Sequence, residues 1–137
     1  MNNMGKFRMP SEKSRWYLPK DDYLTAVHYA LRYPKLLASL PPANSGSAIR
    51  YDRDRVQSSE QYDATSALAM KRLEIKDKLE LIDWCIHQVA NGQDDILRRN
   101  VCYGVTYYQL RDSGYLGSAY EFGQMRQKFY YLLIEYI

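Results

Sequence analysis

The last third of this sequence holds polar and basic side chains of the types that recognise nucleic acid. Arginine pairs with guanine O6 and N7, glutamine pairs with adenine N6 and N7, and tyrosine and serine hydroxyls commonly bond to phosphates. The candidate DNA contacts are Arg98, Arg99, Arg111, Ser118, Tyr120, Gln124, Arg126, Gln127 and Lys128. Bases are usually touched by the start of a recognition helix, so Ser118, Tyr120, Glu121 and Gln124 are expected to read sequence.

A second group of candidate contacts lies in a basic N-terminal arm, residues 1–20. Glu12 is the acidic residue of this arm, and its basic residues are Lys6, Arg8, Lys13, Arg15 and Lys20. Such an arm is either a solvated tail or a segment that follows DNA phosphates. The whole chain carries a net charge of +3, but acidic and basic residues balance in residues 94–137. The C-terminal part therefore lacks the overall basic face that is usual in DNA-binding domains.

Residues suited to catalysis or metal binding do not form a recognisable motif. The sequence has no phosphate-binding glycine loop, no Gly-x-Ser-x-Gly and no His-Glu-x-x-His. Cys85 and His87 are two positions apart on a predicted helix, so they point to different faces. With Cys102 and His28 they lack the paired spacing of a zinc site. We expect neither an enzyme nor a bound metal or cofactor.

Composition indicates a single folded domain. The chain has 137 residues, of which 46% are hydrophobic and 26% charged, and this suits one domain with a modest core. It contains neither an apolar run near the roughly 18 residues that a membrane helix needs nor a signal-like start. Two cysteines in helical patterns suit a reduced, cytoplasmic protein.

The elements that must position the candidate contacts are three predicted helices within residues 93–137. Asp94 suits the start of the first, and Gly104 follows its end. Two residue pairs have the form of a capping box, in which each side chain bonds to the other's backbone N–H: Thr106 with Gln109, and Ser118 with Glu121. They predict a short helix, a turn containing Gly114 and a longer helix, which is the outline of a helix-turn-helix.

Helical spacing also predicts which residues of this unit face inward. The expected core residues are Ile96, Val101, Cys102, Tyr107, Leu110, Phe122, Met125, Phe129, Leu132, Leu133 and Tyr136, with Tyr108 as a further candidate. Arg98 and Arg99 are expected to project from the first helix, and Arg126 is expected on the outer face of the third.

Upstream, the apolar spacing predicts a helix from Asp21 that ends or kinks at Tyr33, because Pro34 disfavours the helical conformation there. A longer helix is predicted over about residues 64–91, ended by Gly92. Its apolar stripe is Leu68, Ile75, Leu79, Ile82, Ile86 and Val89. Residues 41–62 are interpreted as a mobile connection. We thus predict an all-α fold: an arm at 1–20 and one helical domain at 21–137, with a helix-turn-helix-like unit at 93–137.

Three segments carry a resemblance to a known family: Ala67–Ile82, Gly104–Leu110 and Arg126–Leu133. They resemble small phage and prophage proteins of Firmicutes that are described as RinA- or ArpU-type late-gene transcriptional regulators. The resemblance implies a sigma-factor region-4-like helix-turn-helix and a role in phage gene expression in the cytoplasm of the host bacterium. It carries over Gly104, Thr106, Tyr107 and Leu110 as structural positions, and Arg126 and Lys128 as basic ones. The turn at residues 113–117 departs from the pattern, being rich in glycine and poor in charge.

Two functions from different classes are compatible with these patterns. The first is a phage-encoded, DNA-binding transcriptional regulator, whose partners are double-stranded DNA and RNA polymerase. The second is a small interaction protein that binds polymerase, packaging machinery or a host defence factor without binding DNA. The 14 tyrosines favour the second, because tyrosine is common at protein interfaces. Leucines and tyrosines at helical spacing also describe an ordinary bundle. No membrane partner is expected, and the long helix is compatible with a dimer.

Overall fold

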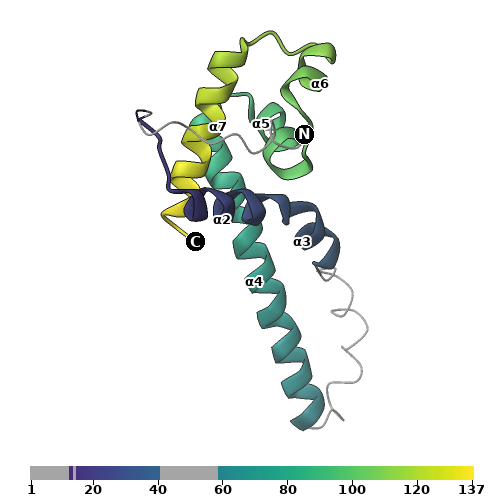
Figure 1. Cartoon of the computed structure of the whole chain (residues 1–137). Helices are drawn as coiled ribbons and strands as arrows, with labels where there is room; N and C mark the ends of the chain where they lie inside the picture. The colour runs from purple at the N-terminus through teal and green to yellow at the C-terminus, as the bar shows by residue number, and fades with distance from the viewer. Residues whose placement is uncertain (1–12, 14, 41–58) are drawn as a thin grey trace.

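The computed structural model describes residue 13 and residues 15–40 and 59–137 (Figure 1). Every regular element in these ranges is a helix, which confirms the predicted all-α fold. The helices are α2 (Lys20–Leu31), α3 (Tyr33–Ser39), α4 (Ser59–Ala90), α5 (Asp94–Tyr103), α6 (Tyr107–Asp112) and α7 (Ala119–Ile134). Side chains of α4 are described from Ser66 onward. In the described ranges no helix combines the length and apolar character needed to cross a membrane.

The break between α2 and α3 falls close to the end or kink predicted at Tyr33. Arg32 separates the two helices, and Pro34 lies in the first turn of α3. A proline is tolerated there because the first N–H groups of a helix have no partner within it. The polypeptide therefore bends at Arg32 and continues in helical form to Ser39.

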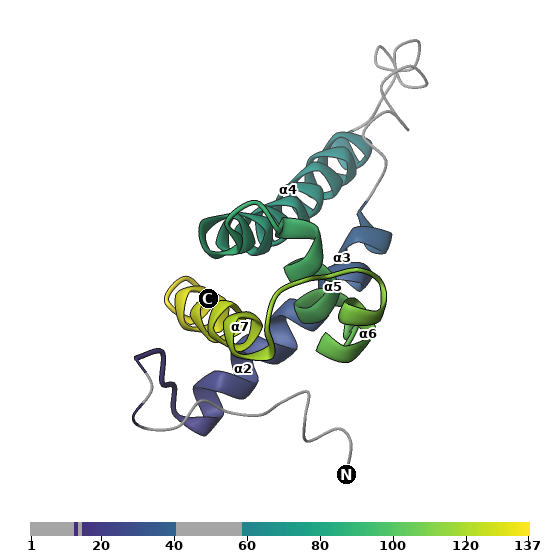
Figure 2. The same cartoon turned by 90° about the horizontal axis from the view of Figure 1, so that it is seen from above.

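The main core lies where α2, α4, α5 and α7 meet. The C-terminal half of α4 packs along α7, and α2 packs against α7 and α5, as the two views in Figures 1 and 2 show. The fully buried side chains of this core include Tyr23, Val27, Ile82, Ile86, Leu97, Val101, Phe129 and Leu133. Each such side chain stabilises the fold by about 1.5–3 kcal/mol relative to an exposed position.

Helix α7 is covered on two sides, which the sequence pattern did not indicate. Tyr130 is 3% exposed, and its ring meets that of Tyr23 on α2 edge-on, with the ring centroids 5.3 Å apart. The predicted apolar face of α7 omitted Tyr130 and included Tyr136, which is 56% exposed. The prediction followed a single stripe, whereas α7 packs against both α2 and α4.

Helix α4 begins at Ser59, earlier than predicted, so the end of the expected connection 41–62 is helical. Residues 41–58 lie outside the described residues. The N-terminal part of α4 extends beyond the other described helices (Figure 1). Leu68 is consequently 53% exposed, and its assignment to the buried stripe was wrong; burial of the stripe starts at Ile75. After α4, Gly92 adopts a positive φ of 86°, as expected for a glycine that ends a helix.

Candidate nucleic-acid interface

The connection from α5 to α6 is closed by Gly104, as its position in the sequence predicts. Gly104 has the left-handed conformation, with φ 72° and ψ 17°. Its N–H donates to the carbonyl of Asn100 at 3.1 Å, and the N–H of Val105 donates to the carbonyl of Arg99 at 3.0 Å. The Asn100 side chain in turn donates to the Val105 carbonyl at 2.8 Å. These bonds satisfy the last carbonyls of α5 and set the direction in which α6 starts.

Both predicted capping boxes are present. At α6 the Gln109 N–H donates to Thr106 Oγ1 at 3.2 Å, and the Thr106 N–H donates to Gln109 Oε1 at 2.9 Å. At α7 the Glu121 N–H donates to Ser118 Oγ at 3.0 Å, and the Ser118 N–H donates to Glu121 Oε1 at 3.2 Å. The first residues of both helices are therefore fixed by the sequence itself.

Residues 113–118 link α6 to α7, a longer connection than the about three to four residues of many helix-turn-helix turns. Tyr115 is 8% exposed and fills the inside of this turn. Gly117 lies so close that a Cβ atom there would overlap the Tyr115 hydroxyl and ring. The Tyr107 hydroxyl donates to the Gly117 carbonyl at 2.9 Å. The glycine-rich turn is thus closely packed around one tyrosine.

A second, smaller hydrophobic cluster joins α6, the turn and α7. Its buried members are Leu110, Tyr115 and Phe122, and Ile96, Val105, Tyr107 and Met125 pack against it. Ile96 was predicted to be buried but is only partly buried here, while its neighbour Leu97 occupies the main core. Tyr108 was a further core candidate and is 63% exposed, so that expectation was wrong. This cluster holds α6 against the first half of α7.

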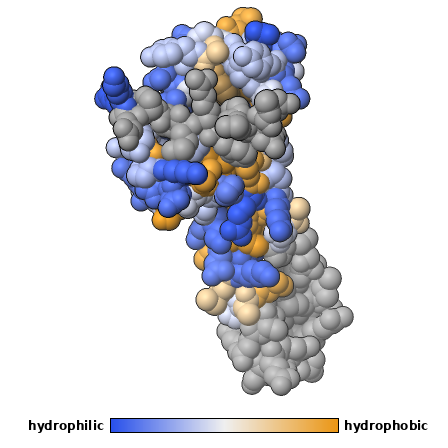
Figure 3. Space-filling model, in the orientation of Figure 1, coloured by the Kyte–Doolittle hydropathy of each residue, from blue (hydrophilic) through white to orange (hydrophobic). Residues whose placement is uncertain are grey.

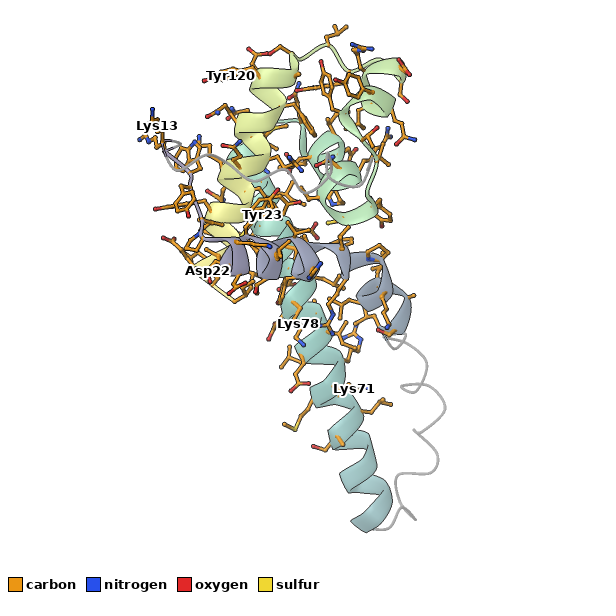
Figure 4. All side chains as sticks on the ribbon, viewed as in Figure 1. Lys13, Asp22, Tyr23, Lys71, Lys78 and Tyr120 are labelled. Carbon is orange, nitrogen blue, oxygen red and sulfur yellow. The ribbon has the colours of Figure 1, made fainter. Side chains whose placement is uncertain are left out.

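The first turns of α7 are left open at one end of the molecule. Ser118 and Tyr120 are exposed, and Gln124 is partly exposed one turn later. Figure 4 shows Tyr120 at the free end of α7, far from the crossing with α2 at Tyr23. Further along, Gln127 is partly exposed and Lys128 is exposed. The helix therefore presents candidate contacts from its first turn to its middle.

The segment Trp16–Pro19 docks on α7. The rings of Trp16 and Tyr131 meet edge-on with centroids 5.5 Å apart, and Leu18 is buried. Two cations lie over the same indole: Arg15 Cζ at 5.0 Å and Lys128 Nζ at 5.3 Å from the ring centroid. This arrangement brings part of the basic arm beside the middle of α7. Lys13 and Lys20 are exposed, and Lys6 and Arg8 lie outside the described residues.

Arg98 does not project to solvent as predicted. Its Nε and Nη2 donate to Asp83 Oδ1 at 3.1 and 2.9 Å, and its Nη1 donates to Asp95 Oδ1 at 3.0 Å. The Tyr33 hydroxyl donates to Asp83 Oδ2 at 3.1 Å. Arg98 therefore ties α5 to α4 and α3, and we remove it from the candidate contacts.

Arg126 also differs from its expected place on an outer face. It is partly buried near Tyr23 and Tyr130. Burial raises the pKa of the Tyr130 hydroxyl, and the neighbouring Arg126 opposes that rise. Arg99 and Arg111 are exposed as expected, and the Arg111 guanidinium lies over the Tyr108 ring, 5.3 Å from its centroid. Within residues 93–137 the exposed arginines thus come from α5 and α6 rather than α7.

Leu116 is the most exposed of the large hydrophobic residues that the structure describes, and the sequence interpretation did not single it out. It is 95% exposed at the tip of the turn before α7. In Figure 3 a small orange area stands among mostly hydrophilic residues at that end of the molecule. Its position between Gly114 and Gly117 places Leu116 in a turn and not on the apolar face of a helix. This position was the sequence signal that Leu116 is exposed.

The cysteines and histidines are not assembled into a site. Burial raises the pKa of both the Cys85 and the Cys102 thiol to about 12, so both stay protonated at neutral pH. His87 Nδ1 lies 2.9 Å from Asp94 Oδ2 at the junction of α4 and α5. Among the described residues, no group of three or more His, Cys, Asp or Glu side chains is placed to hold a metal ion.

No family model matches this chain, and comparisons with curated proteins and with solved structures give no significant match.

Proposed function

We propose that this chain binds double-stranded DNA through the first turns of α7 and regulates transcription, as the phage late-gene regulators that its sequence resembles do. The observation that carries the proposal is the open start of α7. Two capping boxes and the packed turn around Tyr115 fix this start, and Ser118, Ala119 and Tyr120 are exposed on it. A helix presented in this way has the dimensions to enter the major groove of B-DNA.

The residues along the exposed side of α7 suit the two kinds of contact that such a helix makes. Tyr120 and Gln124 lie in its first turns, where a recognition helix meets base edges. Lys128 lies farther along, with Arg15 at the same indole and Lys13 exposed in the same segment. Basic side chains beside a recognition helix neutralise phosphates and supply most of the non-specific affinity. Arg99 and Arg111 add exposed positive charge on α5 and α6.

The proposal is tested by fluorescence anisotropy with labelled promoter duplexes from DNA that neighbours the coding gene. We expect salt-dependent binding at low ionic strength. Lys128→Ala should reduce the slope of log affinity against log salt by about 0.9, the value for one lost phosphate contact. Lys71→Ala is the matched control, because it removes the same charge from the projecting part of α4 (Figure 4). An absence of binding at low salt, or equal slopes for both variants, would count against the proposal.

Regulation is tested separately by transcription in vitro with RNA polymerase from the bound promoter. A change in transcript yield on addition of the protein is expected. That change should be smaller for Lys128→Ala than for Lys71→Ala. Binding to DNA without any effect on transcription would support the proposed DNA binding and contradict the proposed regulatory role.

A second candidate function is binding to another protein, favoured by exposed apolar residues on the projecting part of α4. Leu68, Met70 and Leu73 are 53%, 65% and 58% exposed. Such residues in the core of an interface bury apolar area and stabilise a complex. Affinity capture with the wild-type chain and with Leu73→Glu tests this function. A partner protein retained by the wild type and lost by the variant would support it, whereas recovery of DNA alone from both would oppose it.

A further inference from the structure

The side chains exposed where α7 begins are mainly apolar. Leu116 is 95% exposed and Tyr120 is 75% exposed. Ala119, between them in sequence, is exposed as well. The turn that carries Leu116 is held by the packing of Tyr115 against Gly117 and by the Tyr107 hydroxyl bond to the Gly117 carbonyl. Leu116 is thus presented to solvent by a turn that is itself well packed.

Two polar side chains at the same place, Ser118 and Glu121, are exposed and form the capping box. Glu121 Oε1 accepts the Ser118 N–H, and Ser118 Oγ accepts the Glu121 N–H. The first basic residue of α7 is Arg126, which is partly buried beside Tyr23 and Tyr130. The exposed start of α7 therefore offers no arginine or lysine of its own. Guanine is read mainly by arginine and lysine, whereas thymine is read by apolar contact with its 5-methyl group.

We infer that this surface reads A·T-rich DNA, with Leu116 and Tyr120 contacting thymine 5-methyl groups and Gln124 pairing with adenine. The inference rests on the proposed function and names the sequence class that the same site recognises. Apolar groups discriminate thymine from cytosine because cytosine lacks the methyl group. Glutamine pairs with adenine through N6 and N7. The phosphate contacts of Lys128 and Arg15 carry no sequence information and are unaffected by base identity.

The experiment begins with selection from a pool of duplexes that contain about 20 random base pairs, two turns of DNA. We expect recovered duplexes to be enriched in A·T pairs. Each of the best duplexes is then synthesised again with every thymine replaced by uracil, which removes the methyl groups and keeps base pairing. Affinity should fall by roughly fourfold for each methyl group that the protein contacts, the value for one buried methylene-sized group. The salt slope should stay the same.

Two leucine variants test whether the loss of affinity for uracil duplexes depends on Leu116 in the turn. Leu116→Ala should bind thymine and uracil duplexes with more nearly equal affinity than the wild type. Leu73→Ala should keep the full difference, because Leu73 is an equally apolar residue on the projecting part of α4. Leu116 is so exposed that its replacement should leave the melting temperature unchanged, which circular dichroism checks.

The outcomes separate the inference from the proposed function. If no duplex binds at low salt, both are overturned. If duplexes bind but thymine and uracil forms have equal affinity, or if G·C-rich duplexes are selected, the inference is overturned and DNA binding stands. A uracil penalty in Leu116→Ala as large as that of the wild type would also overturn the role given to the turn.

Discussion

Arg98 donates two hydrogen bonds to a single carboxylate oxygen of Asp83, from Nε at 3.1 Å and from Nη2 at 2.9 Å. The second oxygen of Asp83 accepts the Tyr33 hydroxyl at 3.1 Å, and Arg98 Nη1 donates to Asp95 at 3.0 Å. These four side chains join α3, α4 and α5 at the edge of the main core. An arginine with the sequence features of a nucleic-acid contact is therefore part of the scaffold.

Replacing Arg98 should lower stability rather than DNA affinity. Hydrogen bonds to charged groups contribute about 1.5–3 kcal/mol when shielded, and partial exposure of this pair reduces the expected loss to about 1–2 kcal/mol for Arg98→Ala. The Asp83 side chain is 40% exposed and that of Arg98 is 24% exposed. Arg99→Ala is the control, since Arg99 is exposed and makes no described bond to Asp83. Urea denaturation compares the two, and equal stabilities would contradict the role assigned to Arg98.

The free energy of unfolding should decrease at alkaline pH, because the pKa of Tyr33 is raised in the folded protein. Burial, and next the Asp83 carboxylate, raise the pKa of Tyr33 from 10.0 to about 12. Below pH 10 the Tyr33 hydroxyl keeps its proton in both the folded and the unfolded chain. Its full contribution to the free energy of unfolding is therefore present there. Between about pH 10 and 12 the unfolded chain releases the proton first, so the free energy of unfolding decreases as pH rises.

Tyr33→Phe isolates that contribution. The variant is expected to be less stable at neutral pH, because Asp83 loses one of its donors. Its loss of stability between about pH 10 and 12 should be shallower than that of the wild type. Urea denaturation at a series of pH values gives both quantities. Parallel curves for the two proteins would show that Tyr33 keeps an ordinary pKa.

Two glycines near the start of α7 should respond in opposite directions to alanine. Gly117→Ala places a Cβ atom where Tyr115 already lies, so the turn must shift at a loss of about 1–3 kcal/mol. Gly123 lies within α7, and a Cβ atom there meets no other atom within 4 Å. Gly123→Ala should raise stability by about 0.5–1 kcal/mol, because alanine favours the helix. Thermal denaturation of both variants checks the signs, and destabilisation by both would be inconsistent with the turn described.

The two cysteines should be unreactive in the folded protein. Cys85 and Cys102 are buried, and the pKa of each thiol is raised to about 12. Thiolate, not thiol, attacks disulfide reagents, so Ellman's reagent should label neither residue at neutral pH. Labelling should appear in urea across the unfolding transition. Rapid modification of either cysteine without denaturant would mean that the core opens locally.

Features set by residues close in sequence could be predicted from the sequence. The two capping boxes depend on pairs three residues apart, so their geometry follows once the helices start. Gly92 and Gly104 also end helices where the sequence places them. In each case the bonds that decide the structure join residues no more than six positions apart.

Features set by distant residues could not be predicted. The partner of Arg98 is Asp83, 15 positions away on another helix, and nothing in the α5 pattern distinguishes Arg98 from Arg99. Leu68 continues the apolar spacing of Ile75 but lies beyond the helices that bury the rest of the stripe. Hydrophobic periodicity gives the face of a helix that is buried, but not how far along the helix its partners extend.

Helix α7 belongs to both hydrophobic clusters, with Met125 packed against each. Both tryptophans of the chain meet tyrosines near the C-terminal end of the chain: Trp16 meets Tyr131 and Trp84 meets Tyr136, with ring centroids 5.5 and 5.4 Å apart. A tilt of α7 caused by a ligand at its first turn would therefore move two tyrosines relative to two indoles. In that case a change in tryptophan fluorescence, without any label, would report an event at the opposite end of the helix.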